Sequence, residues 1–183
     1  MNQYDRVLTW NTSLVGLPCQ PTSSEECFAL NLRQRLLRTC VAYGGVGVAA
    51  SQIGVNLRAA LVNYEDRTIM FINPEITETS GGSLFWEGCL SLPLCTGGRA
   101  KNKTYQGGKV HRPDKITVKY QNDGGEEKVE EFTDYMAHIV QHELDHLDGR
   151  FYVEHLSSVE RDIIFRKFRR FQRYFQVVEE VKV

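Results

Sequence analysis

The most informative stretch of the sequence runs from Asp134 to Leu147 and reads DYMAHIVQHELDHL. Its acidic first residue suits a helix start and Gly149 suits a helix end, so the stretch predicts one helix. On a helix, His142 and His146 lie on one face with Cβ atoms roughly 5–6 Å apart. Both imidazoles can then bind one metal ion, and Glu143 can take a proton from an attacking water. Such spacing also arises by chance on surface helices, so the pattern alone leaves both readings open.

A catalytic metal site needs three protein ligands and an open position. The two histidines therefore require a third ligand from elsewhere in the chain. The segment Glu87-Gly88-Cys89-Leu90-Ser91 offers a thiolate, which is a strong ligand for zinc or ferrous iron. Free cysteines more often behave as small buried hydrophobic residues, and on the residues alone that alternative stays open for Cys89.

A third segment, from Gly45 to Gln52, reads GVGVAASQ. The three segments occur in this order in one known family, and the sequence resembles a peptide deformylase. The resemblance runs from the predicted helix before Gly45 through the C-terminal helix, whereas roughly the first twenty residues carry little of it. It implies a metal-dependent hydrolase that removes the formyl group from N-formyl-methionine at the N-terminus of newly synthesised polypeptides and releases formate.

The resemblance also implies roles for individual residues. The expected metal ligands are Cys89, His142 and His146. Glu143 would accept a proton during attack on the formyl carbon and return it to the departing amine. The side chain of Gln52 and the backbone N–H of Leu90 would stabilise the oxyanion. Read alone, Gln52 would more often be a surface amide.

The substrate implied by the resemblance is an N-formyl-methionyl nascent peptide, held by a methionine pocket and by main-chain pairing. Gly45, Val46 and Gly47 are expected to supply that pairing edge, since glycines permit close backbone approach and an extended peptide can add as a strand. A Cys-His-His set suits zinc and ferrous iron about equally. The resemblance favours Fe²⁺ as the physiological ion, with Zn²⁺, Ni²⁺ or Co²⁺ as substitutes.

Composition agrees with one small enzyme. A chain of 183 residues with 42% hydrophobic residues predicts a single domain over residues 1–183. The formal net charge of −1 gives no global attraction to DNA or to a membrane. Five cysteines form an odd set, which favours a reducing compartment, and we expect no signal peptide or membrane span. These features predict a cytoplasmic protein.

The remaining pattern predicts an α+β fold, with antiparallel sheets packed around a central metal-binding helix and with an N-terminal and a C-terminal helix. Ser23 can cap the N-terminal helix, which carries a core-facing stripe and ends at Gly44-Gly45. The stripe comprises Phe28, Leu32, Leu36 and Cys40. Strand-like runs are Ala59–Val62, Ile69–Ile72 and Lys115–Tyr120. The expected breakers between strands are Asn73-Pro74, Gly81-Gly82 and Asp123-Gly124-Gly125.

Three regions carry weaker signals. A polar insertion over residues 95–109 contains two glycine pairs that could be hinges, and it predicts either a lid or a plain surface loop. His138 lies one turn before His142, where the family usually has an apolar residue, and is either a pocket residue or a structural histidine. Asp145 and Asp148 are expected to be solvated helix charges.

The C-terminal helix is predicted to begin after Ser157, with Glu160 as its capping-box partner. Its apolar stripe comprises Ile164, Phe168, Phe171, Phe175 and Val178. Its basic residues are Arg161, Arg166, Lys167, Arg169, Arg170 and Arg173. This basic surface suits contact with ribosomal RNA, and it equally suits a solvated face on a packed helix.

Two other functions fit parts of the pattern. A general zinc metallopeptidase can use the same helix, but it does not need a ligand from the segment Glu87 to Ser91. A non-catalytic module would bind metal without hydrolysing either kind of substrate. The three segments together favour the deformylase.

Overall fold

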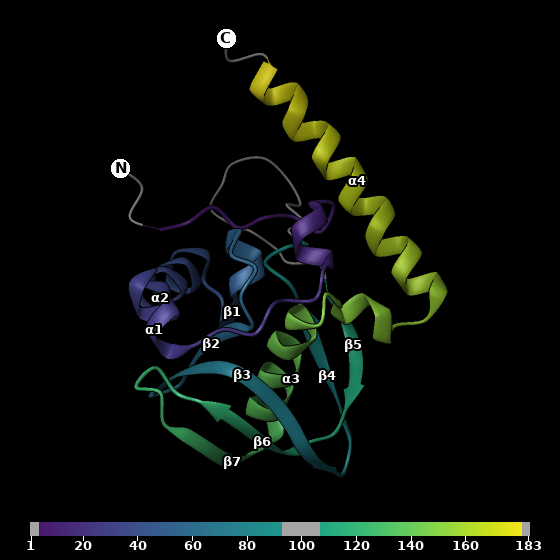
Figure 1. Ribbon diagram of the computed structural model, residues 1–183. Coiled ribbons are helices and arrows are strands. Elements are labelled where there is room, and N and C mark those ends of the chain that lie inside the picture. Colours follow the sequence, from purple (N-terminus) through teal and green to yellow (C-terminus); the bar gives the residue numbers. More distant parts are fainter. Residues whose placement is uncertain (1–3, 93–106, 181–183) are drawn as a thin grey trace.

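The computed structural model describes residues 4–92 and 107–180, and for residues 171–180 it describes the backbone alone. Two antiparallel sheets surround one helix, α3, near the middle of the molecule (Figure 1). The predicted α+β architecture, with sheets around a central helix and further helices toward both ends, is confirmed.

The α-helices are α1 (Ser24–Ala29), α2 (Leu32–Tyr43), α3 (Asp134–Leu147) and α4 (Ser158–Glu180). Three short 3-10 turns are η1 (Ser13–Gly16), η2 (Ala50–Ile53) and η3 (Tyr152–His155). The larger sheet has the strand order β1-β2-β3-β6-β7, with β1 (Gly47–Ala49), β2 (Ala59–Tyr64), β3 (Arg67–Ser80), β6 (Lys115–Gln121) and β7 (Glu127–Thr133). The smaller sheet pairs β4 (Ser83–Gly88) with β5 (Gly107–Arg112).

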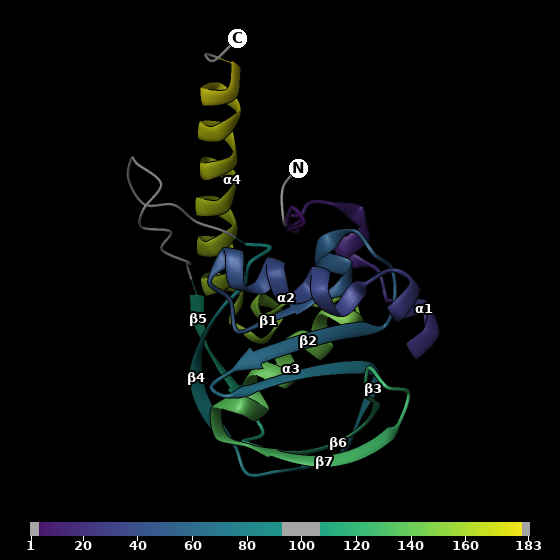
Figure 2. The ribbon, with the colours of Figure 1, turned by 90° about the vertical axis from the view of Figure 1, so that its left-hand side faces the viewer.

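Strands β1 and β2 lie between two helices, with α2 on one face and α3 on the other (Figure 2). The run Ala59–Val62 is buried throughout because both of its faces are covered. Leu61 packs in the cluster beneath α2, and Val62 packs in the cluster that contains Ile139 and Val140 of α3. The core therefore consists of layers on both sides of this strand pair, and α3 is enclosed between sheet surfaces.

Helix α3 spans the predicted residues, from Asp134 to Leu147. Gly149, predicted as its stop, has a φ of 73°, a left-handed conformation that favours glycine. Arg58 closes the C-terminal end by donating to the carbonyl of Leu147 and to the carboxylate of Asp148. The helix end is thus fixed by a residue from the loop before β2.

The N-terminal helix was predicted as one element, and this prediction is wrong. The chain forms α1 and α2, separated at Leu30 and Asn31, and Asn31 adopts a left-handed φ of 50°. The break rotates the first segment, so that Phe28 is 83% exposed and Cys27 is buried in its place. The predicted cap is confirmed, because the Ser23 hydroxyl accepts from the backbone N–H of Glu26.

The Asn73-Pro74 breaker is also wrong, because β3 continues through it to Ser80. The pairing of β3 with β6 shifts register between Ile72 and Glu75, which is a β-bulge. Asn73 sits in the bulge with a φ of 48°, and its side chain bonds both backbone groups of Thr22. The bulge absorbs the proline, and the N-terminal segment stabilises it.

The predicted insertion is shorter than residues 95–109, because Gly107 begins β5 and pairs with Gly88. The second glycine pair is therefore part of a strand and not a hinge. A Cβ atom on Gly107 would overlap the backbone carbonyl of Glu87, so this strand position requires glycine. The part of the insertion at residues 95–106, with Cys95 and the first glycine pair, lies outside the described residues.

Helix α4 begins as predicted, with Ser157 and Glu160 exchanging cap hydrogen bonds. Ile164 and Phe168 are buried, and Trp10 packs against Phe165 with ring centroids 4.5 Å apart. The rest of the helix extends past the body of the molecule (Figure 1). The side chains of Phe171, Phe175, Val178 and Arg173 lie outside the described residues. Within the described part of the chain, no helix is long and apolar enough to cross a membrane.

Candidate metal centre and active site

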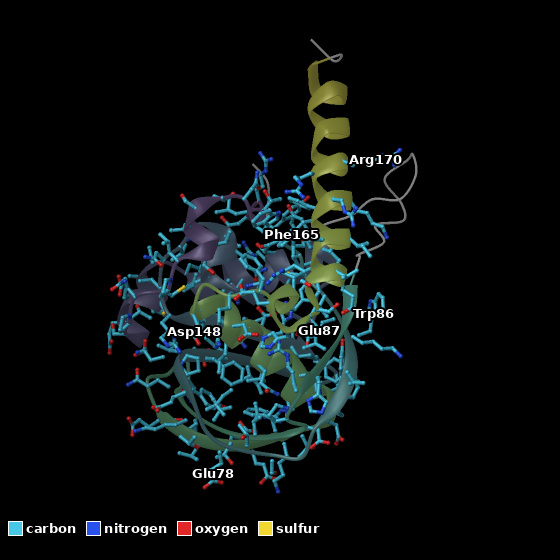
Figure 3. The ribbon with its side chains drawn as sticks, turned by 90° about the vertical axis from the view of Figure 1, so that its right-hand side faces the viewer. Glu78, Trp86, Glu87, Asp148, Phe165 and Arg170 are labelled. Atoms are coloured by element: carbon cyan, nitrogen blue, oxygen red, sulfur yellow. The ribbon has the colours of Figure 1, made fainter. Side chains whose placement is uncertain are left out.

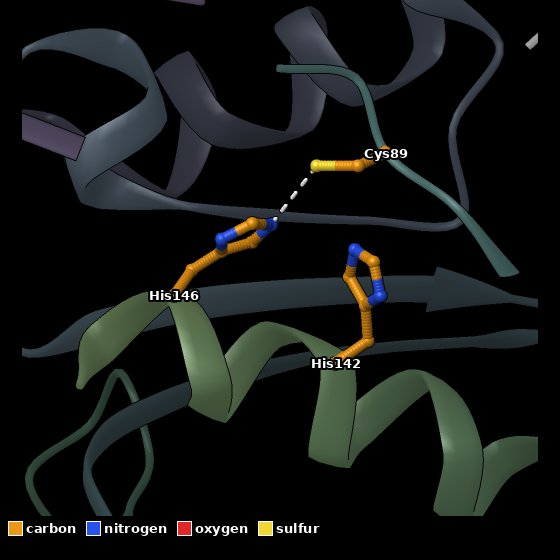
Figure 4. A group of neighbouring side chains, drawn as sticks. All are labelled: Cys89, His142 and His146. Atoms are coloured by element: carbon orange, nitrogen blue, oxygen red, sulfur yellow. Dashed lines mark hydrogen bonds between the residues drawn. The ribbon is translucent and has the colours of Figure 1, made fainter. Parts of the chain in front are cut away.

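The two histidines of α3 and the cysteine after β4 converge on one point. The rings of His142 and His146 lie edge to face, with centroids 5.0 Å apart. The sulfur of Cys89 lies 3.2 Å from Nε2 of His146. One donor atom from each of the three residues lies within 4.8 Å of the other two (Figure 4). The three predicted ligands are therefore brought together by a strand end and one helix face.

The donor set fits a divalent cation of the zinc and iron type. Cys89 is buried, and burial alone would raise the pKa of its thiol. The positive charge of His146 and hydrogen bonds from both histidines outweigh burial and lower the pKa of Cys89 to about 5. The sulfur is thus held as a thiolate, which is the metal-binding form. Cys89 is therefore not the inert buried cysteine of the alternative reading.

Glu143 is buried beside the three donors, and its carboxylate rests on the backbone of Gly47. A Cβ atom on Gly47 would lie 2.8 Å from Cγ of Glu143, so a side chain at that position would displace the carboxylate. Burial raises the pKa of Glu143 to about 7, although the charges of the two histidines act in the opposite direction. Among the described residues, Oε2 of Glu143 has no hydrogen-bond partner. This carboxylate can therefore exchange a proton with a guest at the site.

Gln52 is buried, not the surface amide of the alternative reading. Its Oε1 accepts a hydrogen bond of 2.8 Å from the backbone N–H of Ala49. Its Nε2 donates to the hydroxyl of Ser91 at 3.1 Å and lies 3.7 Å from the sulfur of Cys89. The Ala49 bond fixes the orientation of the amide, so its donor end faces the metal donors. Gln52 can therefore offer N–H groups to an oxygen at the site.

Glu87 has a role that the sequence did not assign. It accepts from Nδ1 of His142 at 2.9 Å and pairs with the guanidinium of Arg112 through two bonds of 2.6 and 3.0 Å. A carboxylate on the second nitrogen of a ligating histidine fixes the ring and its tautomer. Burial opposes ionisation, but the bonds from His142 and Arg112 lower the pKa of Glu87 to about 2. The nearest sequence signal was the position of Glu87 inside the cysteine motif.

The expectation that Asp145 is a solvated helix charge is wrong. Asp145 is 5% exposed and pairs with Nη1 of Arg112 at 2.8 Å and with Nε2 of His155 at 2.8 Å. Despite burial, these two partners lower the pKa of Asp145 to about 2. Asp148 is more exposed and pairs with Arg58. Asp145 and Glu87 thus hold Arg112 from both sides beneath the metal donors.

A cavity of about 410 Å³ opens beside two of the metal donors, Cys89 and His142. It is lined by Gly44, Gly45, Val46, Gly47, Gln52, Trp86, Glu87, Gly88, Cys89, Leu90, Tyr135, His138, Ile139, His142 and Glu143. The predicted substrate-binding residues Gly45, Val46 and Gly47 therefore line the same cavity as the predicted catalytic residues Gln52, Leu90 and Glu143. Figure 3 shows Trp86 at the outer side of β4, where it is exposed, and Glu87 turned inward.

The N-terminal segment around Leu8 and Trp10 holds the backbone of two residues at the site. The backbone N–H of Leu8 donates to the carbonyl of Gln52, and that of Trp10 donates to the carbonyl of Ser91. The indole of Trp10 packs on α4. Sequence reasoning assigned no role to these residues, because irregular backbone pairing leaves no periodic pattern.

A comparison with known families identifies the arrangement. A family model described as polypeptide deformylase matches residues 5–162. The chain belongs to the polypeptide deformylase family. The match begins close to the N-terminus, which corrects the expectation that roughly the first twenty residues carry little resemblance, and it ends in the first turns of α4.

Known relatives agree in sequence and in structure. Peptide deformylase of Bartonella tribocorum is 35% identical over 173 residues, covering 86% of this chain and 91% of its own length. That of Carboxydothermus hydrogenoformans is 41% identical over 132 residues, covering 72% and 80%. The crystal structure of a peptide deformylase from Legionella pneumophila has a TM-score of 0.82 at 28% identity, covering 94% of this chain and 98% of that one. A structure of the Ehrlichia chaffeensis enzyme in complex with actinonin has a TM-score of 0.81 at 25% identity, covering 92% and 98%.

Membership of the deformylase family defines the reaction. The chain is a metal-dependent hydrolase that removes the formyl group from N-formyl-methionine at the N-terminus of newly synthesised polypeptides. Among the described residues, Cys89, His142 and His146 form a group that could hold the metal ion of such a reaction.

Proposed function

We propose that Cys89, His142 and His146 hold one divalent metal ion in this deformylase, and that Glu143 and Gln52 act on the substrate beside it. The observation that carries the proposal is the convergence of three donor atoms within 4.8 Å of one another. When bound, a divalent cation supplies Lewis acidity, which lowers the pKa of a water molecule and polarises a carbonyl oxygen.

Glu143 is the proposed proton carrier. It lies next in sequence to His142, yet its carboxylate turns onto the backbone of Gly47, inside the cavity. From there it can accept a proton from the attacking water and give it to the departing amine. Because Gly47 has no side chain, the carboxylate can remain at this position.

Gln52 and the backbone N–H of Leu90 are the proposed oxyanion donors. As the formyl carbon becomes tetrahedral, its oxygen gains negative charge, and donors that are already oriented stabilise that charge. The Ala49 bond orients the amide of Gln52, and Leu90 follows Cys89 directly on the cavity wall.

Gly45, Val46 and Gly47 are the proposed pairing edge for the peptide. They line the cavity and lead into β1, which is the terminal strand of the larger sheet. A terminal strand offers free backbone donors and acceptors, so an extended peptide can add as a further strand. A Cβ atom on Gly45 would lie 3.1 Å from a methyl of Leu90, so a side chain there would have to push Leu90 aside along this path.

Fe²⁺ is the proposed physiological ion, with Zn²⁺, Ni²⁺ or Co²⁺ able to substitute. One thiolate and two imidazoles suit each of these ions by ligand softness. We further propose that residues 1–183 form a single catalytic domain acting in the cytoplasm. In support, the described cysteines Cys19, Cys27, Cys40 and Cys89 are all unpaired, as a reducing compartment favours.

We also propose that α4 contacts the ribosome, where formylated chains emerge. Four of its five described basic side chains are exposed, namely Arg166, Lys167, Arg169 and Arg170, and the fifth, Arg161, is half-buried. An exposed cationic helix face suits a phosphate backbone, and such contacts weaken as salt rises.

Formate release under anaerobic conditions tests the catalytic proposal. Protein reconstituted with Fe²⁺, Zn²⁺, Ni²⁺ or Co²⁺ is expected to release formate from formyl-methionyl peptides, with the Fe²⁺ form the most active. Unblocked peptides should remain intact at their internal bonds. Cleavage of those internal bonds would instead favour a metallopeptidase, and stoichiometric metal binding without either activity would favour a binding module.

A further inference from the structure

The cavity contains an imidazole that the metal centre does not use. His138 lies one turn before His142 on α3, lines the cavity and is 1% exposed. Its ring packs against Phe85 with centroids 4.3 Å apart. Its Nε2 lies 3.1 Å from the hydroxyl of Ser83. The ring is thus held in place by an aromatic contact on one side and a polar contact at one end.

The other nitrogen of His138 makes no hydrogen bond within the described part of the chain, and it lies near the charged carboxylate of Glu87. Its Nδ1 lies 3.8 Å from Oε1 of Glu87, which is beyond hydrogen-bond distance. Buried polar atoms are nearly always paired, so an unpaired nitrogen at a cavity wall is unusual. A guest in the cavity can supply the hydrogen-bond partner that the described residues do not.

Geometry also indicates which nitrogen carries the proton. Burial lowers the pKa of His138, so the ring is neutral and has one N–H. If Nδ1 carried no proton, its lone pair would face the negatively charged carboxylate of Glu87 and be repelled. An N–H at Nδ1 is attracted by the same carboxylate. Ser83 can donate its hydroxyl proton to Nε2. The favoured tautomer therefore directs a donor that makes no hydrogen bond toward Glu87, a residue that also lines the cavity.

We propose that His138 determines side-chain specificity in this cavity, favouring the methionine thioether over its all-carbon isostere norleucine. The inference rests on the proposed function, in which the cavity holds the first residue of the formylated peptide. A thioether sulfur is a weak acceptor and makes favourable contacts with aromatic rings, whereas a methylene group is not an acceptor. An apolar side chain at position 138 would bind the methionine and norleucine side chains with about the same affinity.

The test compares kcat/KM for two peptides that differ only in formyl-methionine or formyl-norleucine at the first position. The wild-type enzyme should prefer methionine by about two- to tenfold, the range expected for one sulfur–aromatic contact or weak hydrogen bond. His138→Leu should lower this ratio to about one while retaining metal and activity on norleucine. Ile139→Val is the matched control, because it alters the same wall without changing polarity and should leave the ratio unchanged.

Two results would overturn the proposal. A wild-type ratio of about one would do so without any variant, which keeps the test decisive even if His138→Leu fails to fold. A ratio preserved in folded His138→Leu would show that another residue selects the sulfur. Failure of the proposed function would look different, since no formate would then be released from either peptide.

Discussion

Helices α3 and α4 are both amphipathic and rich in charge, yet the protein uses their charges in opposite ways. In α3, Glu143 and Asp145 are buried, and Asp145 has partners on other elements. In α4, Ile164 and Phe168 are buried, while four of the five described basic residues, among them Arg170, face solvent (Figure 3). An amphipathic pattern therefore identifies a helix without revealing how much its polar residues matter.

The difference follows from what surrounds each helix. Sheets enclose α3, so its polar groups lose water and need fixed partners, and removing one partner is costly. Water surrounds most of the described surface of α4, so its charges are screened and individually weak. Substitutions at polar residues of α3, or of its partners, should therefore have large effects, and those at charges of α4 should have small ones.

The largest effect is expected at the metal ligands and the proton carrier. His146→Ala should lose both metal and turnover, since two ligands rarely hold a catalytic divalent ion. Glu143→Ala should keep the metal, and its kcat should fall by about 10²–10⁴-fold, the contribution typical of a general base. Metal analysis beside formate release measures both. A folded Glu143→Ala protein that is empty of metal would contradict this division of roles.

A smaller loss is expected at Gln52, which contacts the α3 site from η2. Gln52→Leu should lower kcat by about 10²–10³ with KM little changed, as for removal of one oxyanion donor. Steady-state kinetics on a formyl-methionyl peptide separates the two constants. A raised KM with normal kcat would mean that Gln52 holds the peptide and does not act on the transition state.

Acid should weaken the protein through Asp145. Its pKa falls from 3.8 to about 2 on folding, so the stabilisation is present above about pH 4 and is lost as pH falls toward 2. The shift corresponds to roughly 2 kcal/mol. Urea unfolding of metal-free protein should show a flatter pH dependence in Asp145→Asn than in the wild type.

The exposed Asp162 of α4 provides the matched control for Asp145. Asp162→Asn should change the free energy of unfolding by less than about 0.5 kcal/mol, as is usual for surface substitutions. If Asp145→Asn and Asp162→Asn changed the free energy of unfolding by the same amount, burial would not explain why charges matter more in α3 than in α4.

The smallest effect on catalysis is expected from the basic face of α4. Replacing Arg166, Lys167, Arg169 and Arg170 with serine should leave kcat/KM on short formylated peptides unchanged, because none of them lines the cavity. Ribosome association, measured by co-sedimentation over a salt series, should weaken and lose its salt dependence. Unchanged co-sedimentation would leave α4 with a solvated face and no role in docking.

Much of the site could be predicted because its signals are local or shared with a family. The bounds of α3 followed from an acidic start, a glycine stop and two histidines at helical spacing. The metal donors and Gln52 followed from three motifs in a fixed order, and the structure brings them together. Their chemical roles remain predictions that the substitutions above can test.

Other features were invisible in the sequence. Glu87, Asp145 and Arg112 lie on β4, α3 and β5, and no local pattern links them. The break at Asn31 and the bulge at Asn73 were missed for the same reason, since propensity describes a segment in isolation.

By itself, the sequence determined which residues form the central helix and which side chains can bind the metal, because capping and periodicity act within a few residues. Tertiary structure alone decided which charges are buried and paired. It also decided that β3 continues through Asn73 and Pro74 and that the N-terminal segment supports Gln52 and Ser91. These outcomes depend on hydrogen bonds and desolvation between segments far apart in the chain, and such energies exist only once the chain is folded.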